Sequence, residues 1–165
     1  MSDSRLSQPT LKFSLYLADE AATLALGSEL AAVMVPGLMV YLSGHLGAGK
    51  TTLARALLKG LGYTGKVKSP TYTLVEVYAV SRLNLYHFDF YRFGNSQEWL
   101  DAGFRDYFTA DAVCLVEWPE KAAGSLPKAD LTISLSMHET GRSVTIAAGT
   151  QEGEQCLKRL EQLPR

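Results

Sequence analysis

The chain has 165 residues, a length that predicts one compact domain with room for a buried core. Its 47% hydrophobic and 20% charged residues are ordinary for a globular protein. The net charge of −1 argues against an isolated nucleic-acid-binding protein, which normally carries a basic surface. We find no signal peptide and no apolar stretch of membrane-spanning length. Two cysteines, Cys114 and Cys156, predict neither a disulfide framework nor a metal site, so we expect a cytoplasmic protein.

The first part of the chain predicts a strand, a helix and a second strand. Weak apolar alternation over residues 11–17 is typical of an edge strand. Asp19 is a suitable N-cap for a helix that ends near Met34. The apolar run 38–42 has the length of a strand, and the leucine spacing over 51–61 predicts a helix after it.

A phosphate-binding loop is predicted between that strand and that helix. The segment Gly44-x-x-x-x-Gly49-Lys50-Thr51 has P-loop spacing, in the strand–loop–helix context that the motif requires. Its glycines allow several backbone N–H groups to face one anion, its lysine reaches the β- and γ-phosphates, and its threonine hydroxyl ligates Mg²⁺. The expected nucleotide-binding residues of the loop are Gly44, His45, Leu46, Gly47, Ala48, Gly49, Lys50, Thr51 and Thr52.

The middle of the chain predicts a mixed sheet. A polar loop over 66–73 leads into strand-like runs at 72–80 and 82–90, which almost nothing separates. Because a parallel crossover needs a dozen or more residues, these two strands must be antiparallel. Together with the P-loop, this predicts an α/β fold: a P-loop NTPase three-layer sandwich with a mixed parallel and antiparallel central sheet flanked by helices.

The second half of the chain predicts a helix, a buried strand, a hairpin and a terminal helix. Asn95 begins a capping-box pattern. The run 112–116 is continuously apolar, as in a strand that is buried on both faces. Residues 131–137 and 143–147 alternate around a glycine-containing turn, which predicts a hairpin, and an amphipathic helix is expected from Thr150 to Leu163.

Two acidic residues at the ends of predicted strands are candidates for metal binding or catalysis. Ligands of open α/β sheets bind beyond the carboxyl ends of the strands, where Glu117 and Asp89 would lie. Glu117 follows its apolar run as in a Walker B strand, so we favour it over Asp89 for holding Mg²⁺ or orienting a water. The alternative for either residue is a solvated or ion-paired carboxylate. Trp118 is expected to pack in the core or to shield the site.

Other polar residues have structural alternatives of comparable weight. Thr71 and Thr73 lie in a loop that is suited to sensing a γ-phosphate, or in a hydroxyl-rich turn around Pro70. The side chain of His45 is expected to point to solvent. His87 is expected to be a structural histidine, with contact to a site residue as the alternative. No Asn/Thr-Lys-x-Asp segment of the guanine-specific kind occurs, which favours ATP over GTP.

Five segments follow one another in an order and spacing shared with one family. They are GHLGAGKTT at 44–52, KSPTYTLVE at 68–76, YHFDFYR at 86–92, GFRDYF at 103–108 and CLVEWPE at 114–120. Over about 15–141 the sequence resembles the bacterial TsaE ATPases of tRNA threonylcarbamoyladenosine biosynthesis. The resemblance implies ATP and Mg²⁺ as cofactors. It also implies two partner proteins, the threonylcarbamoyl transferase subunit and its inactive paralogue, which modify A37 of tRNAs that read ANN codons.

In that family the ATPase does not perform the transfer. Its ATP hydrolysis supports turnover of the partner pair, and the ATPase contacts tRNA only indirectly, through the complex with these partners. Where family members commonly carry Asp, this chain has His45, but the position contributes mainly backbone, so binding is expected to survive. The resemblance implies the following roles: catalytic Glu117, Asp89 and Lys50; metal ligands Thr51 and Glu117; switch residues Ser69, Pro70 and Thr71; Trp118 beside the nucleotide; and Arg142 at the base.

The expected organisation is a single ATPase domain over residues 1–165, with 1–10 loose and the terminal helix within 150–165. We expect a low intrinsic rate because no obvious arginine finger is fixed in the P-loop region, which leaves Arg92 or a partner residue to supply positive charge. A small-molecule kinase is the alternative from another class, although no arginine-rich lid is evident. A third hypothesis is a non-catalytic scaffold, in which ATP binding alone changes the surface that the chain presents to its partners.

Overall fold

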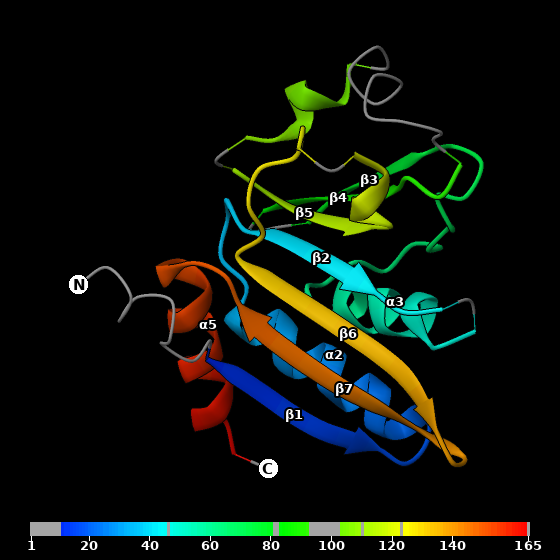
Figure 1. The fold of residues 1–165 in the computed structure, drawn as a ribbon, viewed down its shortest axis with the longest axis vertical. Coiled ribbons are helices and arrows are strands. Elements are labelled where there is room, and N and C mark those ends of the chain that lie inside the picture. Colours follow the sequence, from blue (N-terminus) through cyan, green and yellow to red (C-terminus); the bar gives the residue numbers. More distant parts are fainter. Residues whose placement is uncertain are drawn as a thin grey trace.

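A mixed β-sheet runs through the molecule, as Figure 1 shows. In the computed structural model, the described residues form a seven-stranded sheet in the order β1-β7-β6-β2-β5-β4-β3. The strands are β1 (Lys12–Leu17), β2 (Met39–Ser43), β3 (Val75–Ala79), β4 (Asn84–Asp89), β5 (Ala112–Glu117), β6 (Leu131–His138) and β7 (Gly141–Ala148).

The structure describes most of the chain. The described residues are 11–45, 47–80, 83–92, 103–109, 111–122 and 124–164. Leu46, the expected helix from Asn95 and residues 1–10 lie outside this part of the chain. Within it, no helix combines the length and the apolar character needed to cross a membrane.

Strand direction changes from the centre of the sheet to its margins. The neighbouring strands β6, β2, β5 and β4 run parallel to one another. At the margins, β3 is antiparallel to β4, β7 is antiparallel to β6, and β1 is antiparallel to β7. The predicted edge strand, the hairpin and the antiparallel β3–β4 pair are confirmed. The prediction that β3 begins at residue 72 is wrong. The preceding residues form a turn in which the Leu74 amide donates to the Pro70 carbonyl (2.8 Å), so the strand begins at Val75.

Three helices of the described chain pack on one face of the sheet (Figure 1). They are α2 (Glu20–Val33), α3 (Lys50–Gly60) and α5 (Gln151–Gln162). The predicted N-cap at Asp19 is confirmed, because its carboxylate accepts the Ala22 amide at 2.9 Å. Thr150 caps α5 in the same way by accepting the Gly153 amide. Side-chain acceptors at these positions satisfy amides that the helix itself leaves free.

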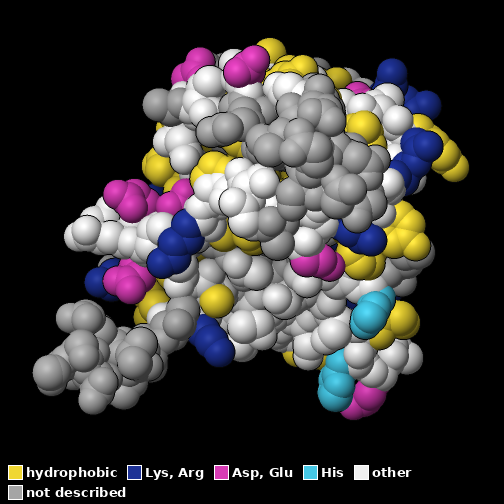
Figure 2. Space-filling view, turned by 45° about the horizontal axis from the view of Figure 1, so that its top comes forward, with side chains coloured by type: hydrophobic (Ala, Val, Ile, Leu, Met, Phe, Trp, Pro, Cys, Tyr) yellow, Lys and Arg dark blue, Asp and Glu magenta, His cyan; other side chains and the backbone are white. Residues whose placement is uncertain are grey.

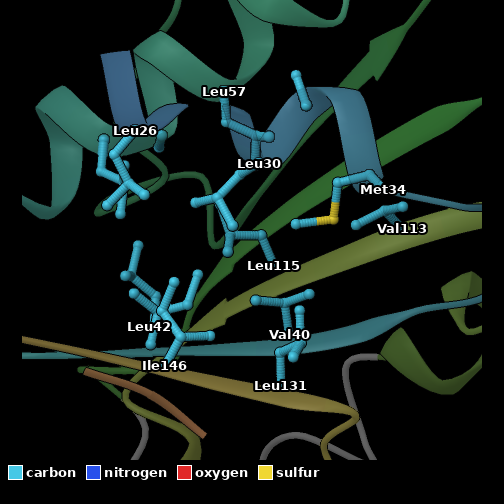
Figure 3. Close-up of a cluster of buried hydrophobic side chains, with 14 of the residues drawn as sticks. Leu26, Leu30, Met34, Val40, Leu42, Leu57, Val113, Leu115, Leu131 and Ile146 are labelled. Atoms are coloured by element: carbon cyan, nitrogen blue, oxygen red, sulfur yellow. The ribbon is translucent and has the colours of Figure 1, made fainter. Parts of the chain in front are cut away.

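The main core lies between the helices and the sheet. Figure 3 shows Leu26, Leu30 and Met34, from α2 and its C-cap, above side chains of the central strands. Fully burying one such side chain contributes about 1.5–3 kcal/mol. Strand β5 is buried along its whole length, as predicted, because its alternate side chains enter two separate hydrophobic clusters. On the second face, the packing against this strand includes residues of the 3₁₀ helices η1 (Phe104–Tyr107) and η2 (Pro119–Ala122).

Candidate functional site

The site is built at the carboxyl ends of three adjacent parallel strands. Asp89 ends β4 and Glu117 ends β5, and the two residues are paired in register. Glu117 is also paired with Leu42 of β2, the strand that leads into the P-loop. Strand order and register therefore bring both predicted carboxylates next to the P-loop.

The P-loop turns directly into the first turn of α3. Gly49 has a left-handed backbone (φ 104°), a conformation that glycine adopts without strain, and α3 begins at the next residue, Lys50. Gly44 is needed for a second reason, because a Cβ there would lie 2.7 Å from the Leu135 carbonyl oxygen. The loop thus presents the N-terminus of a helix, where free N–H groups and the helix dipole favour an anion.

Glu117 is held between two basic side chains. Its Oε1 lies 3.4 Å from the Lys50 ammonium, and its Oε2 accepts a 2.7 Å hydrogen bond from His87 Nε2. Burial alone would raise the pKa of the Glu117 carboxyl. The His87 hydrogen bond and the charges of His87 and Lys50 outweigh burial and hold this pKa below its ordinary value. Glu117 is therefore ionised at neutral pH, and His87 contacts the site directly.

Asp89 has the opposite electrostatic environment. Burial raises the pKa of its carboxyl, with the Glu117 charge adding to the rise, while the hydrogen bond from the Tyr91 amide (2.9 Å) opposes it. Two neighbouring carboxylates whose pKa values move apart are suited to different tasks. Glu117 suits the permanent charge of a metal ligand, and Asp89 suits proton transfer.

An aromatic pair adjoins Lys50. Trp118 has a positive φ of 58°, which is uncommon for a residue with a side chain, and its ring lies 4.5 Å from the Lys50 ammonium. The Tyr91 ring packs on Trp118 with centroids 4.9 Å apart. Trp118 thus lies beside the P-loop lysine. Tyr91 was not singled out from the sequence, although it follows Asp89 by only two residues.

Arg142 reaches the P-loop from strand β7. Its guanidinium donates to the backbone carbonyls of Ala48 (2.9 Å), Gly47 (3.3 Å) and Gly141 (3.1 Å). Arg142 is therefore fixed beside the P-loop as a structural contact, which leaves the expectation about an arginine finger a prediction. Arg142 is separated from Ala48 by 94 residues in the chain, so local sequence patterns do not reveal this contact.

The predicted switch segment lies next to Asp89. The Ser69 and Thr71 hydroxyls are 2.8 Å apart, and the Asp89 amide donates to the carbonyl of Leu74, which ends the turn. The exposed His45 side chain agrees with the expectation that this residue contributes backbone to the P-loop. Its carbonyl accepts the Ala48 amide at 3.0 Å.

One cavity of about 410 Å³ gathers most of the predicted site residues; we call it the phosphate cavity. Its lining includes Gly47, Gly49, Lys50, Thr51, Thr52, Ser69, Thr71, Asp89, Glu117, Trp118 and Arg142. A neighbouring cavity of about 220 Å³, the helix-side cavity, shares three residues with it and continues toward the start of α2. The shared residues are Gly49, Thr52 and Arg142. Arg142 therefore lies where the two cavities join.

The donor set of the phosphate cavity fits a nucleotide with Mg²⁺. Mg²⁺ is usually bound through one or two protein oxygen ligands together with substrate phosphates. Thr51 and Glu117 line the same cavity and can supply such ligands. In the described part of the chain, no group of three or more His, Cys, Asp or Glu side chains is placed to hold a metal. The arrangement suits an ion that is carried in with phosphate.

Comparison with known proteins agrees with this geometry. Residues 17–144 match the family described as threonylcarbamoyl adenosine biosynthesis protein TsaE. The TsaE protein of Haemophilus influenzae is 44% identical over 144 residues, which cover 84% of this chain and 91% of the relative. The chain belongs to the TsaE family. The TsaE protein of Bacillus subtilis is 39% identical over 127 residues, covering 76% of this chain and 79% of the relative.

A solved structure extends the TsaE likeness to the fold. The crystal structure of Bacillus subtilis YdiB superimposes with a TM-score of 0.82 and 30% sequence identity, covering 94% of this chain and 98% of the other. The predicted P-loop α/β fold with a mixed sheet is thereby confirmed. The matched range of the TsaE family contains the P-loop, both carboxylates and Arg142.

Proposed function

We propose that this TsaE-family chain serves tRNA threonylcarbamoyladenosine biosynthesis as an ATPase. Family membership supports the biosynthetic role. The observation that carries the ATPase proposal is the phosphate cavity, in which a P-loop lysine and threonine meet two carboxylates with opposite pKa shifts. The absence of a guanine-specific segment from the sequence favours ATP.

In the proposed reaction each residue has one task. The P-loop N–H groups and Lys50 bind the phosphates, and Thr51 and Glu117 hold Mg²⁺, which supplies positive charge to the phosphate oxygens when bound. Asp89, whose pKa is raised, orients the attacking water and accepts its proton. Arg142 fixes the loop by binding its carbonyls and lies at the entrance of the helix-side cavity, which offers space for the nucleoside.

The phosphates compete with Glu117 for Lys50. Lys50 and Glu117 are both buried, with side-chain exposures of 6% and 8%, so each requires an opposite charge nearby. When Lys50 turns toward a phosphate, the hydrogen bond from His87 still holds Glu117 in place. Binding therefore exchanges one set of ion pairs for another.

We further propose that the chain acts on the threonylcarbamoyl transferase subunit and its inactive paralogue, and meets tRNA only through them. The near-neutral charge supports indirect contact with RNA. On the face drawn in Figure 2, acidic and basic side chains are mixed on the left of the view, and basic side chains predominate only along its right edge. ATP hydrolysis would then support turnover of the partner pair.

The first experiment measures phosphate release from MgATP and MgGTP, with and without both purified partner proteins. We expect a low rate with MgATP, a sharp rise only when both partners are present, and little activity with MgGTP. A high rate without partners, or a rate that requires a metabolite acceptor, would contradict the proposal and favour an independent hydrolase or a small-molecule kinase.

Variants of the metal ligands test the assignment of residues. Thr51→Ala and Glu117→Gln should lose Mg²⁺-dependent hydrolysis while circular dichroism shows a folded chain. Glu117→Gln is preferable to Glu117→Ala, because both remove the charge that faces Lys50 but the amide keeps the shape of the side chain and an oxygen that can accept the His87 hydrogen bond. Wild-type turnover in Glu117→Gln would remove this residue from the metal role.

A further inference from the structure

A third cavity adjoins Lys50, and its lining does not include the switch residues. It has a volume of about 300 Å³ and lies between the first P-loop residues, the end of β6 and the segment that follows β5; we call it the β6-side cavity. It shares Lys50 and Trp118 with the phosphate cavity. The two cavities therefore meet at the lysine that binds phosphate in the proposed reaction.

The lining of the β6-side cavity is suited to a planar cation. Glu120 supplies a carboxylate, Ser43 and Ser136 supply hydroxyl oxygens, and Trp118 supplies an aromatic ring, while the basic side chains that also line the cavity are those of Lys50 and His45. This ring already holds a cation, the Lys50 ammonium, 4.5 Å from its centre. A guanidinium matches such a lining, because it pairs with carboxylates, donates several hydrogen bonds and stacks on aromatic rings.

The proposed ATPase needs a further cation at this position. Many P-loop NTPases use an arginine, in cis or from a partner, to neutralise charge in the transition state. Of the described cations around the phosphate cavity, Arg142 is bound to three carbonyls, Arg92 lies over Tyr72, and Lys121 lies over Tyr91. These three side chains have other contacts, so among the described cations named here Lys50 is the one placed to bind the phosphates.

An acceptor substrate fits the β6-side cavity less well than a cation. Phosphate transfer to a hydroxyl requires a nearby base, and Asp89 and Glu117 line the phosphate cavity rather than this one. The carboxylate of the β6-side cavity is Glu120, whose side chain is exposed. An exposed carboxylate beside an aromatic ring is better suited to pairing with an incoming positive charge.

We propose that the β6-side cavity receives an arginine side chain of a partner protein, which pairs with Glu120, packs on Trp118 and supplies positive charge beside Lys50. This inference rests on the proposed ATPase function. When Lys50 turns toward the phosphates, the ring of Trp118 becomes available to the arginine. ATP and the partner should therefore strengthen each other's binding by the same factor, as thermodynamic linkage requires.

The test uses methylguanidinium chloride as an analogue of the arginine side chain and methylammonium chloride at equal ionic strength as the control. ATP hydrolysis by the chain alone should rise saturably with millimolar methylguanidinium and not with methylammonium. Glu120→Gln should raise the half-saturating concentration about tenfold, as expected for loss of one charge-assisted contact, and should leave the basal rate unchanged. Ser136→Trp, which fills the cavity, should abolish the stimulation.

A binding measurement keeps the test independent of hydrolysis. In a Trp99→Phe background, Trp118 is the one remaining tryptophan, and its fluorescence should respond to methylguanidinium with the same dependence on Glu120. A complete lack of basal hydrolysis would contradict the proposed function. The fluorescence titration would still show whether the β6-side cavity binds a guanidinium. The arginine site would be overturned by a lack of response in both measurements, or by an equal response of the chains with Glu120 and with Glu120→Gln. Competition by a hydroxyl compound that becomes phosphorylated would also overturn it.

Discussion

At the scale of single residues, two buried carboxylates one strand apart have opposite electrostatic environments. Glu117 faces Lys50 and His87, which together lower its pKa despite burial. Asp89 lies in the same cavity, but burial dominates and raises its pKa. Strand position alone would make these two residues equivalent. Their side-chain contacts separate a residue that stays charged from one that can exchange a proton.

Asp89→Asn should lower activity and raise stability. A pKa that is higher in the folded chain favours folding below the unfolded value of 3.8, and this contribution is lost as pH rises through the folded pKa. At pH 7 the ionised Asp89 therefore opposes folding, whereas an amide of the same shape carries no charge and can still accept the Tyr91 amide. We expect a higher melting temperature at pH 7 and a fall in kcat of about 10²-fold or more.

The pH dependence of that stability gain provides the control. A gain of 1 kcal/mol would raise the melting temperature by about 2–4 °C in a chain of this size. The gain should vanish as pH falls below 3.8, where the protonated carboxyl resembles the amide. Asp106→Asn, at an exposed position, should show neither effect. A melting temperature that falls at pH 7 would contradict the electrostatic cost assigned to Asp89.

At the scale of elements, the position of α3 depends on close packing against α2. Gly27 in α2 faces Ala56 in α3, and a Cβ at Gly27 would collide with the Ala56 Cβ and lie 2.8 Å from its carbonyl carbon. Because α3 begins at Lys50, its placement sets the position of the phosphate-binding N–H groups. This helix contact therefore links core packing to the site.

Gly27→Ala should destabilise the chain although alanine is the better helix former. The change gains up to about 1 kcal/mol of helix propensity, but a collision between close-packed helices costs about 1–3 kcal/mol or more. We expect a lower midpoint in urea and weaker ATP binding. Ala25→Leu, which enlarges an exposed side chain of the same helix, should change stability by at most about 0.5 kcal/mol. Equal effects of the two changes would argue against this role of the helix contact.

At the scale of the whole molecule, the site joins distant parts of the sequence. The P-loop follows β2, the carboxylates end β4 and β5, and Arg142 comes from β7. A ligand that contacts all of them should stabilise the fold as a unit, because it binds the folded chain and not the unfolded one.

MgATP should therefore raise the melting temperature of the whole chain. At a free concentration 100-fold above the dissociation constant, binding stabilises by about 2.7 kcal/mol, which corresponds to about 5–10 °C here. MgGTP at the same concentration should give a smaller shift, and Lys50→Ala should remove most of the MgATP shift. A thermal scan by differential fluorimetry suffices. An unchanged midpoint with MgATP would count against nucleotide binding at the P-loop.

The sequence alone determined the features that depend on neighbouring residues. The P-loop follows from glycine spacing, the Asp19 cap from its place before a helical pattern, and the antiparallel β3–β4 pair from a connection too short for a crossover. These features are local, so periodicity and turn chemistry encode them directly. The start of β3 comes later than the pattern predicts because a local turn closed by the Leu74–Pro70 hydrogen bond takes up the first strand-like residues.

Only the tertiary structure decided which distant side chains meet. The His87–Glu117 hydrogen bond depends on β4 and β5 being neighbours in one register, and the Arg142 contact depends on the hairpin that carries β7 lying beside the P-loop. The opposite pKa shifts of the two carboxylates follow from these contacts and from burial. Strand order and register are properties of the complete sheet, fixed by how all its hydrophobic faces pack together, and no single segment of the sequence specifies them.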